Sequence, residues 1–137
     1  MSTLPPDYKP EDDEAFMNPL QQEYFRQKLL RWRSDLLVDS EEARHHLKED
    51  SLVEADLTDR ASIETERSLE LRTRDRARKL IVKIDEALER IEKGSYGYCL
   101  ETSEPITLSR LEARPIATLS VEAQERHERM EKTHRDE

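Results

Sequence analysis

The sequence ARKLIVKIDEALERI occupies residues 77–91 and places apolar side chains at alternating steps of three and four. The resulting stripe consists of Ala77, Leu80, Ile84, Ala87 and Ile91, and is broadened by Ile81 and Leu88. This is the a/d spacing of a coiled coil, in which one face of a helix packs against a partner helix. The pattern predicts a helix from about Arg60 to Lys93 that ends at Gly94.

A second stripe precedes this helix and begins near Pro19, a residue type that the first turn of a helix accepts. It consists of Phe25, Leu29, Trp32 and Leu36, widened by Leu30 and Leu37. Beyond Asp39 the stripe becomes polar, and cap-forming residues at 54–59 separate the two helices. Because the connection is short, the sequence predicts an antiparallel hairpin with an apolar base and a polar tip at residues 55–61.

The composition supports long helices and little else. Only 34% of the 137 residues are hydrophobic and 40% are charged, which is too small an apolar stock for a sandwich, a barrel or an α/β enzyme. Each predicted arm has roughly 35 residues and is about 50 Å long. The expected fold class is mostly α, with a long antiparallel coiled-coil hairpin, a small globular base and a C-terminal helix.

The segments outside the hairpin complete this organisation. Residues 1–17 are rich in proline and acidic residues and are expected to form a flexible leader before the hairpin of residues 18–93. Residues 94–119 are expected to form the globular base. Ser120 is a candidate N-cap for a charged last helix over residues 120–137.

The charge balance limits the possible partners. With 23 basic and 32 acidic residues, the net charge of −9 opposes binding to nucleic acid, so a protein partner is expected. No apolar run approaches the roughly 18 residues of a membrane span, and the N-terminus lacks the pattern of a signal peptide. We therefore expect a cytoplasmic protein. The chain has no phosphate-binding loop, dinucleotide motif or activated nucleophile, so it is not expected to be an enzyme.

Two charged features have both a structural and a functional interpretation. Asp56 and Asp59 lie at the predicted tip, where they are either an acidic probe of a partner site or caps of the second helix. A basic ridge, defined as Arg72, Arg76, Lys79 and Lys83, follows one face of the second helix. This ridge is either a solvated face with weak intrahelical ion pairs or a site for an anion where it meets the globular base.

Four positions have the outline of a paired CxxC metal site: Cys99 and Thr102, followed by Ser120 and Ala123. Three of these four residues cannot serve as zinc ligands in such a cage, because zinc needs strong thiolate, imidazole or carboxylate donors. His127 is expected to be an exposed residue of the last helix. The sequence therefore predicts no metal ion.

Several of these segments together resemble the DksA family of bacterial transcription regulators. The resemblance is carried by SLELRTRDR at residues 68–76, YGYC at 96–99 and RLEARP at 110–115. It extends from about Glu14 to Gln124 and includes RWR at residues 31–33. It implies a coiled-coil hairpin that enters the secondary channel of RNA polymerase without binding DNA, on a base like a degenerate zinc ribbon.

The resemblance also assigns roles to individual residues. Asp56, Asp59 and Ala61 match the D-x-x-D-x-A tip of the family, which acts near the active centre of the polymerase. Arg76 matches a residue that supports docking of the hairpin on the polymerase.

Three further positions match the family's joint with the alarmone ppGpp at the polymerase surface: Leu80, Lys83 and Arg114. The two cations are suited to phosphate oxygens and Leu80 to apolar packing. A further basic position of the family is Gln124 in this chain, which implies that the response to ppGpp is weaker or is carried by residues of the polymerase.

The clearest departure from many family members is at the positions of Cys99, Thr102, Ser120 and Ala123, where those members hold zinc with four cysteines. This chain resembles the zinc-free branch, and we expect apolar packing to replace the metal. The expected packing residues are Ile106, Leu108, Leu111, Ile116, Leu119 and Val121.

The leading hypothesis is a monomeric regulator that binds RNA polymerase and acts with ppGpp to change the stability of promoter complexes. The resemblance implies repression of ribosomal RNA promoters and activation of amino-acid biosynthesis promoters. One alternative is a Gre-like factor whose apical acids assist transcript cleavage. Another alternative is a coiled-coil adaptor that is unrelated to polymerase.

Overall fold

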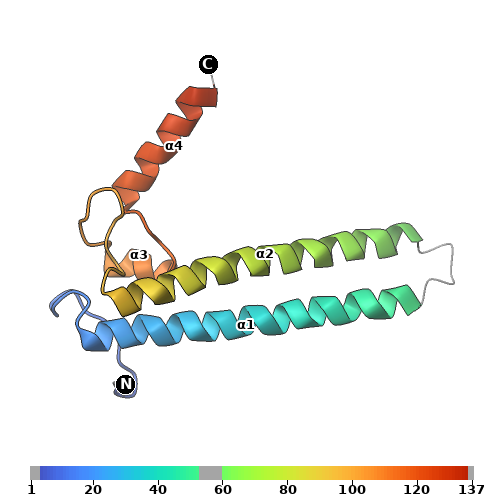
Figure 1. Ribbon diagram of the computed structural model, residues 1–137, viewed down its shortest axis with the longest axis horizontal. Coiled ribbons are helices and arrows are strands. Elements are labelled where there is room, and N and C mark those ends of the chain that lie inside the picture. The colour runs from blue at the N-terminus through green and yellow to red at the C-terminus, as the bar shows by residue number, and fades with distance from the viewer. Residues whose placement is uncertain (1–3, 53–59, 136–137) are drawn as a thin grey trace. The chain divides into compact units, whose positions relative to one another are not determined.

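The computed structural model describes residues 4–52 and 60–135, and it shows four helices in these ranges (Figure 1). They are α1 (Pro19–Leu52), α2 (Arg60–Lys93), α3 (Leu108–Ala113) and α4 (Val121–Arg135). The described residues contain no strand, only an isolated bridge between Tyr98 and Pro105. The two long helices begin and end where the apolar pattern predicts, and the mostly α fold class is confirmed.

Backbone contacts group the chain into two units. The terminal unit consists of Met1–Leu29 and Glu86–Glu137, and the hairpin unit consists of Leu30–Asp85. No helix in the described ranges is long and apolar enough to cross a membrane.

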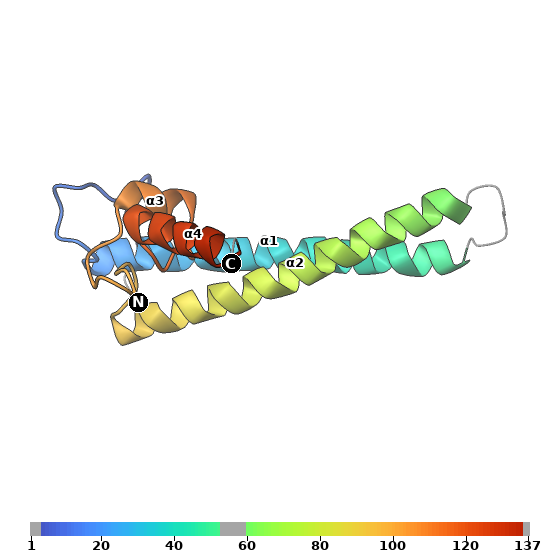
Figure 2. The ribbon, with the colours of Figure 1, turned by 90° about the horizontal axis from the view of Figure 1, so that it is seen from above.

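In the hairpin unit, the segments of α1 and α2 run antiparallel, side by side (Figures 1 and 2). An ion pair of 2.8 Å between Arg33 Nε and Asp85 Oδ1 joins the beginning of one segment to the end of the other. Between the helices, Ala43 packs on the α1 side, and Ala77 and Ile84 are buried on the α2 side. Complete burial of Ile84 stabilises the pair by roughly 1.5–3 kcal/mol.

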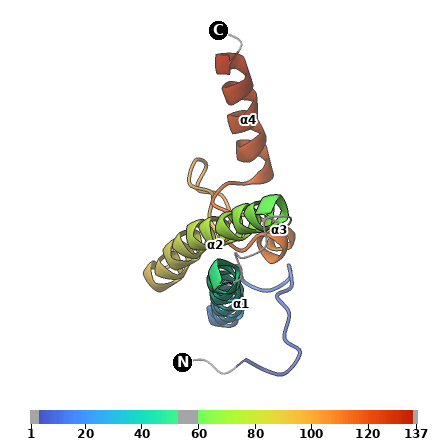
Figure 3. The same ribbon diagram turned by 90° about the vertical axis from the view of Figure 1, so that its right-hand side faces the viewer.

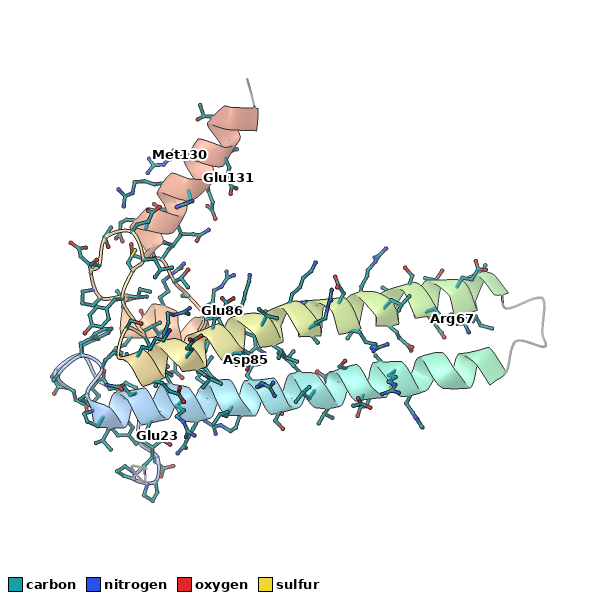
Figure 4. All side chains as sticks on the ribbon, in the orientation of Figure 1. Glu23, Arg67, Asp85, Glu86, Met130 and Glu131 are labelled. Atoms are coloured by element: carbon teal, nitrogen blue, oxygen red, sulfur yellow. The ribbon has the colours of Figure 1, made fainter. Side chains whose placement is uncertain are left out.

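Toward the N-terminus of α2, the a/d positions that continue from Ala77 are occupied by polar residues. Arg67, Glu70 and Arg74 are half-buried at positions that follow the a/d steps from Ala77, and Arg67 is labelled in Figure 4. Charged side chains in a coiled-coil seam cost desolvation energy that apolar residues do not. Over residues 67–74 this polar seam agrees with the expected loss of apolar contacts away from the base of the hairpin, and the next step is the half-buried Ile63.

The terminal unit has an apolar core that draws on every part of its sequence. The buried residues are Met17, Phe25, Leu29, Ala87, Ile91, Tyr96, Cys99, Ile106, Leu111, Ile116, Ala117 and Ala123. Inside it, the rings of Phe25 and Tyr96 lie 5.7 Å apart, and the Tyr96 hydroxyl donates a hydrogen bond of 2.7 Å to the Pro115 carbonyl. Burial raises the pKa of Tyr96, so this hydroxyl stays protonated and remains a donor.

The start of α1 is fixed by a variant of the capping box. The Asn18 side chain accepts a hydrogen bond of 3.0 Å from the backbone amide of Gln21, and the Gln21 side chain accepts one of 2.8 Å from the amide of Met17. Pro19 takes the first helical position, where its missing N–H has no cost. The buried Gln21 side chain is therefore satisfied, and the helix has a defined beginning.

Residues before α1 make contacts that the expectation of a flexible leader missed. The Tyr8 hydroxyl donates a hydrogen bond of 2.9 Å to Glu14, and Phe16 packs edge-on against Tyr98 with ring centroids 5.3 Å apart. Met17 is buried. The acidic and proline-rich composition of this segment gave no indication that its few apolar side chains contact the rest of the terminal unit.

Glycine is required at one turn of this unit. Gly97 has a φ of +91°, and a Cβ atom there would lie 3.2 Å from both Phe16 and Met17. Gly94, which follows α2, has a φ of +79°, with no neighbour within 4 Å of such an atom. Gly97 therefore permits both a left-handed backbone and the close approach of the segment before α1.

Candidate functional site

The predicted tip lies mostly outside the described residues. This applies to Asp56 and Asp59, so their capping and partner-facing interpretations both stay predictions. Ala61, the third residue of the tip motif, lies in the first turn of α2 and is exposed.

The basic ridge forms on α2, and all four of its side chains are exposed. Lys79 pairs with Asp75 at 3.1 Å, and Asp75 also accepts a hydrogen bond of 2.8 Å from Arg78. Those two hydrogen bonds, from Arg78 and then from Lys79, hold the pKa of Asp75 below its usual value. Lys79 is therefore neutralised within the helix, as the solvated-face interpretation requires.

The other three ridge cations differ from Lys79. Within the described ranges, Arg72, Arg76 and Lys83 have no ion pair within 4.0 Å. Their charges are therefore available to an acidic partner or to a phosphate group. Leu80 lies on the same helix, half-buried, between Arg76 and Lys83.

Arg114 belongs to the terminal unit, where it is the C-cap of α3 and is exposed. Its backbone amide donates a hydrogen bond of 2.7 Å to the Arg110 carbonyl, and the Arg110 side chain donates one of 2.9 Å to the Leu119 carbonyl. These bonds hold the backbone of the RLEARP segment and leave the Arg114 guanidinium at the surface. Gln124 is half-buried in α4, and its amide donates to Glu128 at 3.3 Å.

Two positions of the degenerate metal motif, Thr102 and Ser120, lie next to the sulfur of Cys99. The motif begins in a turn in which the Cys99 amide donates to the Glu104 carbonyl at 2.8 Å. Burial raises the pKa of the Cys99 thiol, but hydrogen bonds outweigh burial and lower this pKa to about 6. These hydrogen bonds come from the side chain of Thr102 and from the backbone at Ser120, Thr102 and Glu101. The thiol is therefore largely a thiolate at neutral pH.

The chemistry of these residues does not fit a zinc ion. Besides the Cys99 thiolate, the motif offers two un-ionised hydroxyl groups, from Thr102 and Ser120, and the methyl group of Ala123. In the described part of the chain, no three His, Cys, Asp or Glu side chains are grouped so that they could hold a metal ion. The Ser120 hydroxyl instead accepts a hydrogen bond of 3.2 Å from the Ala123 amide, the N-cap that the sequence predicts for α4.

The apolar residues expected to replace zinc are mostly in place. Ile106, Leu111 and Ile116 are buried, and Leu108 and Leu119 are half-buried. The expectation was wrong for Val121, which is 44% exposed in the first turn of α4. The first turn of α4 turns Ala123 inward instead, and Ala123 is completely buried.

Sequence reasoning missed a contact between the cysteine turn and α4. His127 Nε2 contacts the Glu101 carboxylate, and Arg126 lies 4.0 Å from the same carboxylate. His127 is exposed, as expected. Figure 3 shows α4 extending away from α3, and Met130, labelled in Figure 4, is 61% exposed. Since Glu101 and His127 are 26 residues apart in different elements, no periodicity in the sequence indicates their contact.

An antiparallel helix hairpin and, in the terminal unit, a turn with one cysteine of a C-x-x-C outline define a helical-hairpin protein with a degenerate metal-type turn. Two family models match this chain: "DnaK suppressor protein DksA, N-terminal domain" over residues 21–91, and "Prokaryotic dksA/traR C4-type zinc finger" over residues 94–129. The chain belongs to the DksA family, as its motifs indicate.

Individual relatives agree with this assignment. The RNA polymerase-binding transcription factor DksA of Caulobacter vibrioides is 65% identical over 95% of this chain and 92% of its own length. The protein of the same name from Escherichia coli K12 is 40% identical over 84% of this chain and 76% of its own length. The solved structure of transcription factor DksA2 from Pseudomonas aeruginosa superposes with a TM-score of 0.81 at 46% identity, over 89% of this chain and 94% of that one.

Proposed function

We propose that this protein binds RNA polymerase and regulates transcription. The observation that carries the proposal is the 65% identity, over 95% of the chain, to an RNA polymerase-binding transcription factor. Three exposed ridge cations without an ion pair in the described ranges support it: Arg72, Arg76 and Lys83. Exposed positive charges on a chain with a net charge of −9 are suited to an acidic surface of a protein partner. Its role is non-enzymatic, and it acts in the cytoplasm as a single copy.

The hairpin acts as a probe that enters the secondary channel of the polymerase without binding DNA. Each long helix has 34 residues and is therefore about 51 Å long. Asp56, Asp59 and Ala61 then act near the active centre, while Arg76 supports docking on the polymerase surface. Two carboxylates alter a mobile catalytic element there through charge and hydrogen bonding.

The protein acts together with ppGpp at the joint between the two proteins. Lys83 and Arg114 contact phosphate oxygens, and Leu80 packs against an apolar surface. The exposure of both cations supports this assignment. Because Gln124 replaces a basic residue, ppGpp has one charged contact fewer. Together with ppGpp, the protein alters the stability of promoter complexes, which represses ribosomal RNA promoters and activates amino-acid biosynthesis promoters.

The protein works without zinc. The mismatch between the zinc-finger family model and the donor chemistry of Thr102, Ser120 and Ala123 supports this proposal. The buried apolar residues of the terminal unit supply the folding free energy that a metal ion supplies in small zinc domains.

Multi-round transcription from a ribosomal RNA promoter tests the function, with and without the protein and ppGpp. We expect repression by the wild-type protein, greater with ppGpp. Asp59→Asn, which removes one charge and keeps the shape of the side chain, is expected to bind polymerase normally and to lose repression. Full repression by this variant would contradict the role of the tip.

Two further assays separate the alternatives. Addition of the protein to stalled transcription complexes is expected to give no RNA cleavage, whereas a Gre-like factor would shorten the transcript. A pull-down with core polymerase is expected to succeed, and its failure would favour an adaptor unrelated to polymerase.

A further inference from the structure

Glu112 of α3 is held by two side chains of α1. The Tyr24 hydroxyl donates a hydrogen bond of 2.6 Å to Glu112 Oε1, and Lys28 Nζ lies 2.6 Å from the same oxygen. The Lys28 ammonium also lies 6.0 Å from the centre of the Tyr24 ring. All three residues belong to the terminal unit, and they link positions more than 80 residues apart in the sequence. We call this cluster the Glu112 clamp.

The carboxylate of the Glu112 clamp is ionised at neutral pH. Partial burial raises the pKa of Glu112, but hydrogen bonds from Lys28 and Tyr24 and the charges of Lys28 and Lys9 lower it below its usual value. The Glu112 carboxylate is therefore ionised, and both donors remain bound to it.

Stability alone is a weak explanation for this arrangement. The Glu112 side chain is 45% exposed, and ion pairs as exposed as this one contribute little to folding. The clamp has a larger effect on orientation. All six residues of α3 are described, Leu111 is the only buried one, and so short a helix is not stable by itself. Besides Leu111, the half-buried Leu108 and the hydrogen bond from the Arg110 side chain to the Leu119 carbonyl hold α3 within the unit, and the contacts of Glu112 add a tie to α1.

Arg114 lies between the clamp and a second fixed point. Two residues before it, Glu112 is bound to α1, and directly after it, the Pro115 carbonyl accepts the buried hydrogen bond from Tyr96. The backbone around Arg114 is thus held on both sides, while its side chain is exposed. A cation presented in this way loses less conformational freedom when it binds an anion.

We propose that Glu112 is a positioning residue that, through Tyr24 and Lys28, orients Arg114 toward the phosphate groups of ppGpp. This inference rests on the proposed contact between Arg114 and ppGpp. Glu112 itself does not touch the nucleotide, since two anions repel one another.

The sign of the effect makes the proposal testable. If Glu112 acted only through its charge, Glu112→Gln would remove a negative group near the phosphates and would strengthen the response to ppGpp. A positioning role predicts the opposite. The variant loses the ion pair with Lys28, α3 becomes less constrained, and the half-maximal ppGpp concentration rises about 3- to 10-fold.

The measurement is the lifetime of a ribosomal promoter complex at saturating protein over a series of ppGpp concentrations. The affinity for polymerase without ppGpp and the thermal midpoint are measured for each variant. Both are expected to stay close to the wild-type values in Glu112→Gln, which a merely structural role would not allow. Glu92→Gln is the matched control, because Glu92 is an exposed glutamate of the same unit with no ion pair among the described residues. It is expected to leave the ppGpp response unchanged.

A charge swap tests the geometry. Lys28→Glu combined with Glu112→Lys restores an ion pair between α1 and α3, and the Tyr24 hydroxyl can accept a hydrogen bond from the new ammonium group. The double variant is expected to recover a half-maximal ppGpp concentration within about twofold of wild type, well inside the predicted shift.

Arg114→Ala separates the proposed contact between Arg114 and ppGpp from the proposed positioning role of Glu112. Loss of the ppGpp response in Arg114→Ala, together with the predicted shift in Glu112→Gln, supports both the ppGpp contact and the positioning role. If Arg114→Ala loses the response while Glu112→Gln keeps it, the positioning role is wrong and the ppGpp contact stands. An unchanged response in Arg114→Ala overturns both. A parallel loss of polymerase affinity without ppGpp in Glu112→Gln also overturns the positioning role.

Discussion

Leu111 tests the proposal that apolar packing holds the terminal unit together without zinc. Its side chain is completely buried, and it is the apolar anchor of α3. Replacement by alanine removes three carbon atoms from the core while leaving every hydrogen bond of the cysteine turn in place. If apolar packing has replaced the metal, Leu111→Ala must destabilise this unit substantially.

The size of the effect follows from the burial of the side chain. Loss of three buried carbon atoms costs about 2.4 kcal/mol at about 0.8 kcal/mol for each. The cavity that remains adds to this cost, which gives an expected loss of about 2.5–5 kcal/mol for Leu111→Ala. Val121→Ala is the matched control, because Val121 is 44% exposed and its truncation costs less than about 1 kcal/mol.

The chain provides separate spectroscopic signals for its two units. All four tyrosines (Tyr8, Tyr24, Tyr96 and Tyr98) lie in the terminal unit, and the single tryptophan, Trp32, lies in the hairpin unit. Urea titration followed by near-ultraviolet circular dichroism of the tyrosines therefore reports on the terminal unit. Fluorescence of Trp32 reports on the hairpin unit. The titration is repeated with EDTA, which is expected to change neither transition of the wild-type protein.

Three results would refute this reasoning. A loss of less than about 1 kcal/mol in the tyrosine transition of Leu111→Ala would show that packing around this residue is not what stabilises the unit. A lower unfolding midpoint of the wild-type protein in EDTA would show that a metal ion contributes to its stability. Equal losses in Leu111→Ala and Val121→Ala would also contradict the difference in burial.

Three further predictions concern the same unit. Elemental analysis of protein purified without added metal is expected to find no stoichiometric zinc, and one zinc ion per chain would contradict the donor chemistry. Gly97→Ala is expected to cost about 1–3 kcal/mol and Gly94→Ala less, because both have positive φ but only Gly97 has neighbours within 3.2 Å of the added Cβ. The pKa of Cys99 falls from 9.0 in the unfolded chain to about 6 in the folded one, so its stabilising effect is complete above pH 9 and is lost as the pH falls through about 6. The difference in unfolding free energy between wild type and Cys99→Ser should therefore be larger at pH 9 than at pH 6, and an equal difference would contradict the lowered pKa.

The apolar periodicity was sufficient to predict the two long helices, because their fold depends on contacts that repeat along the chain. Ile84 and Phe25 are buried where the a/d steps place them. The N-cap at Ser120 was also predictable, since capping is local in sequence. The resemblance to the DksA family supplied the roles at the tip and at the ppGpp joint, which no periodicity indicates.

The contacts that sequence reasoning missed join distant segments through single side chains. The packing of Phe16 against Tyr98 and the clamp on Glu112 each depend on where two separate elements meet. The error at Val121 has a similar cause. The direction in which α4 leaves the cysteine turn decides which of its residues face the core, and that direction is not encoded in the helix itself.

The environment of Cys99 supports the proposal that the zinc-type turn keeps its shape without a metal ion. In metal sites, hydrogen bonds from surrounding groups orient the ligands and stabilise their charge. In this chain, hydrogen bonds from the Thr102 side chain and nearby backbone groups stabilise the thiolate of Cys99, although the motif offers no second strong metal ligand. The same turn is tied to the segment before α4 by a hydrogen bond of 2.9 Å from the Leu100 amide to the Thr118 carbonyl. Neither contact requires a cation, so on the proposal of a zinc-free fold we expect chelators to leave the response to ppGpp unchanged.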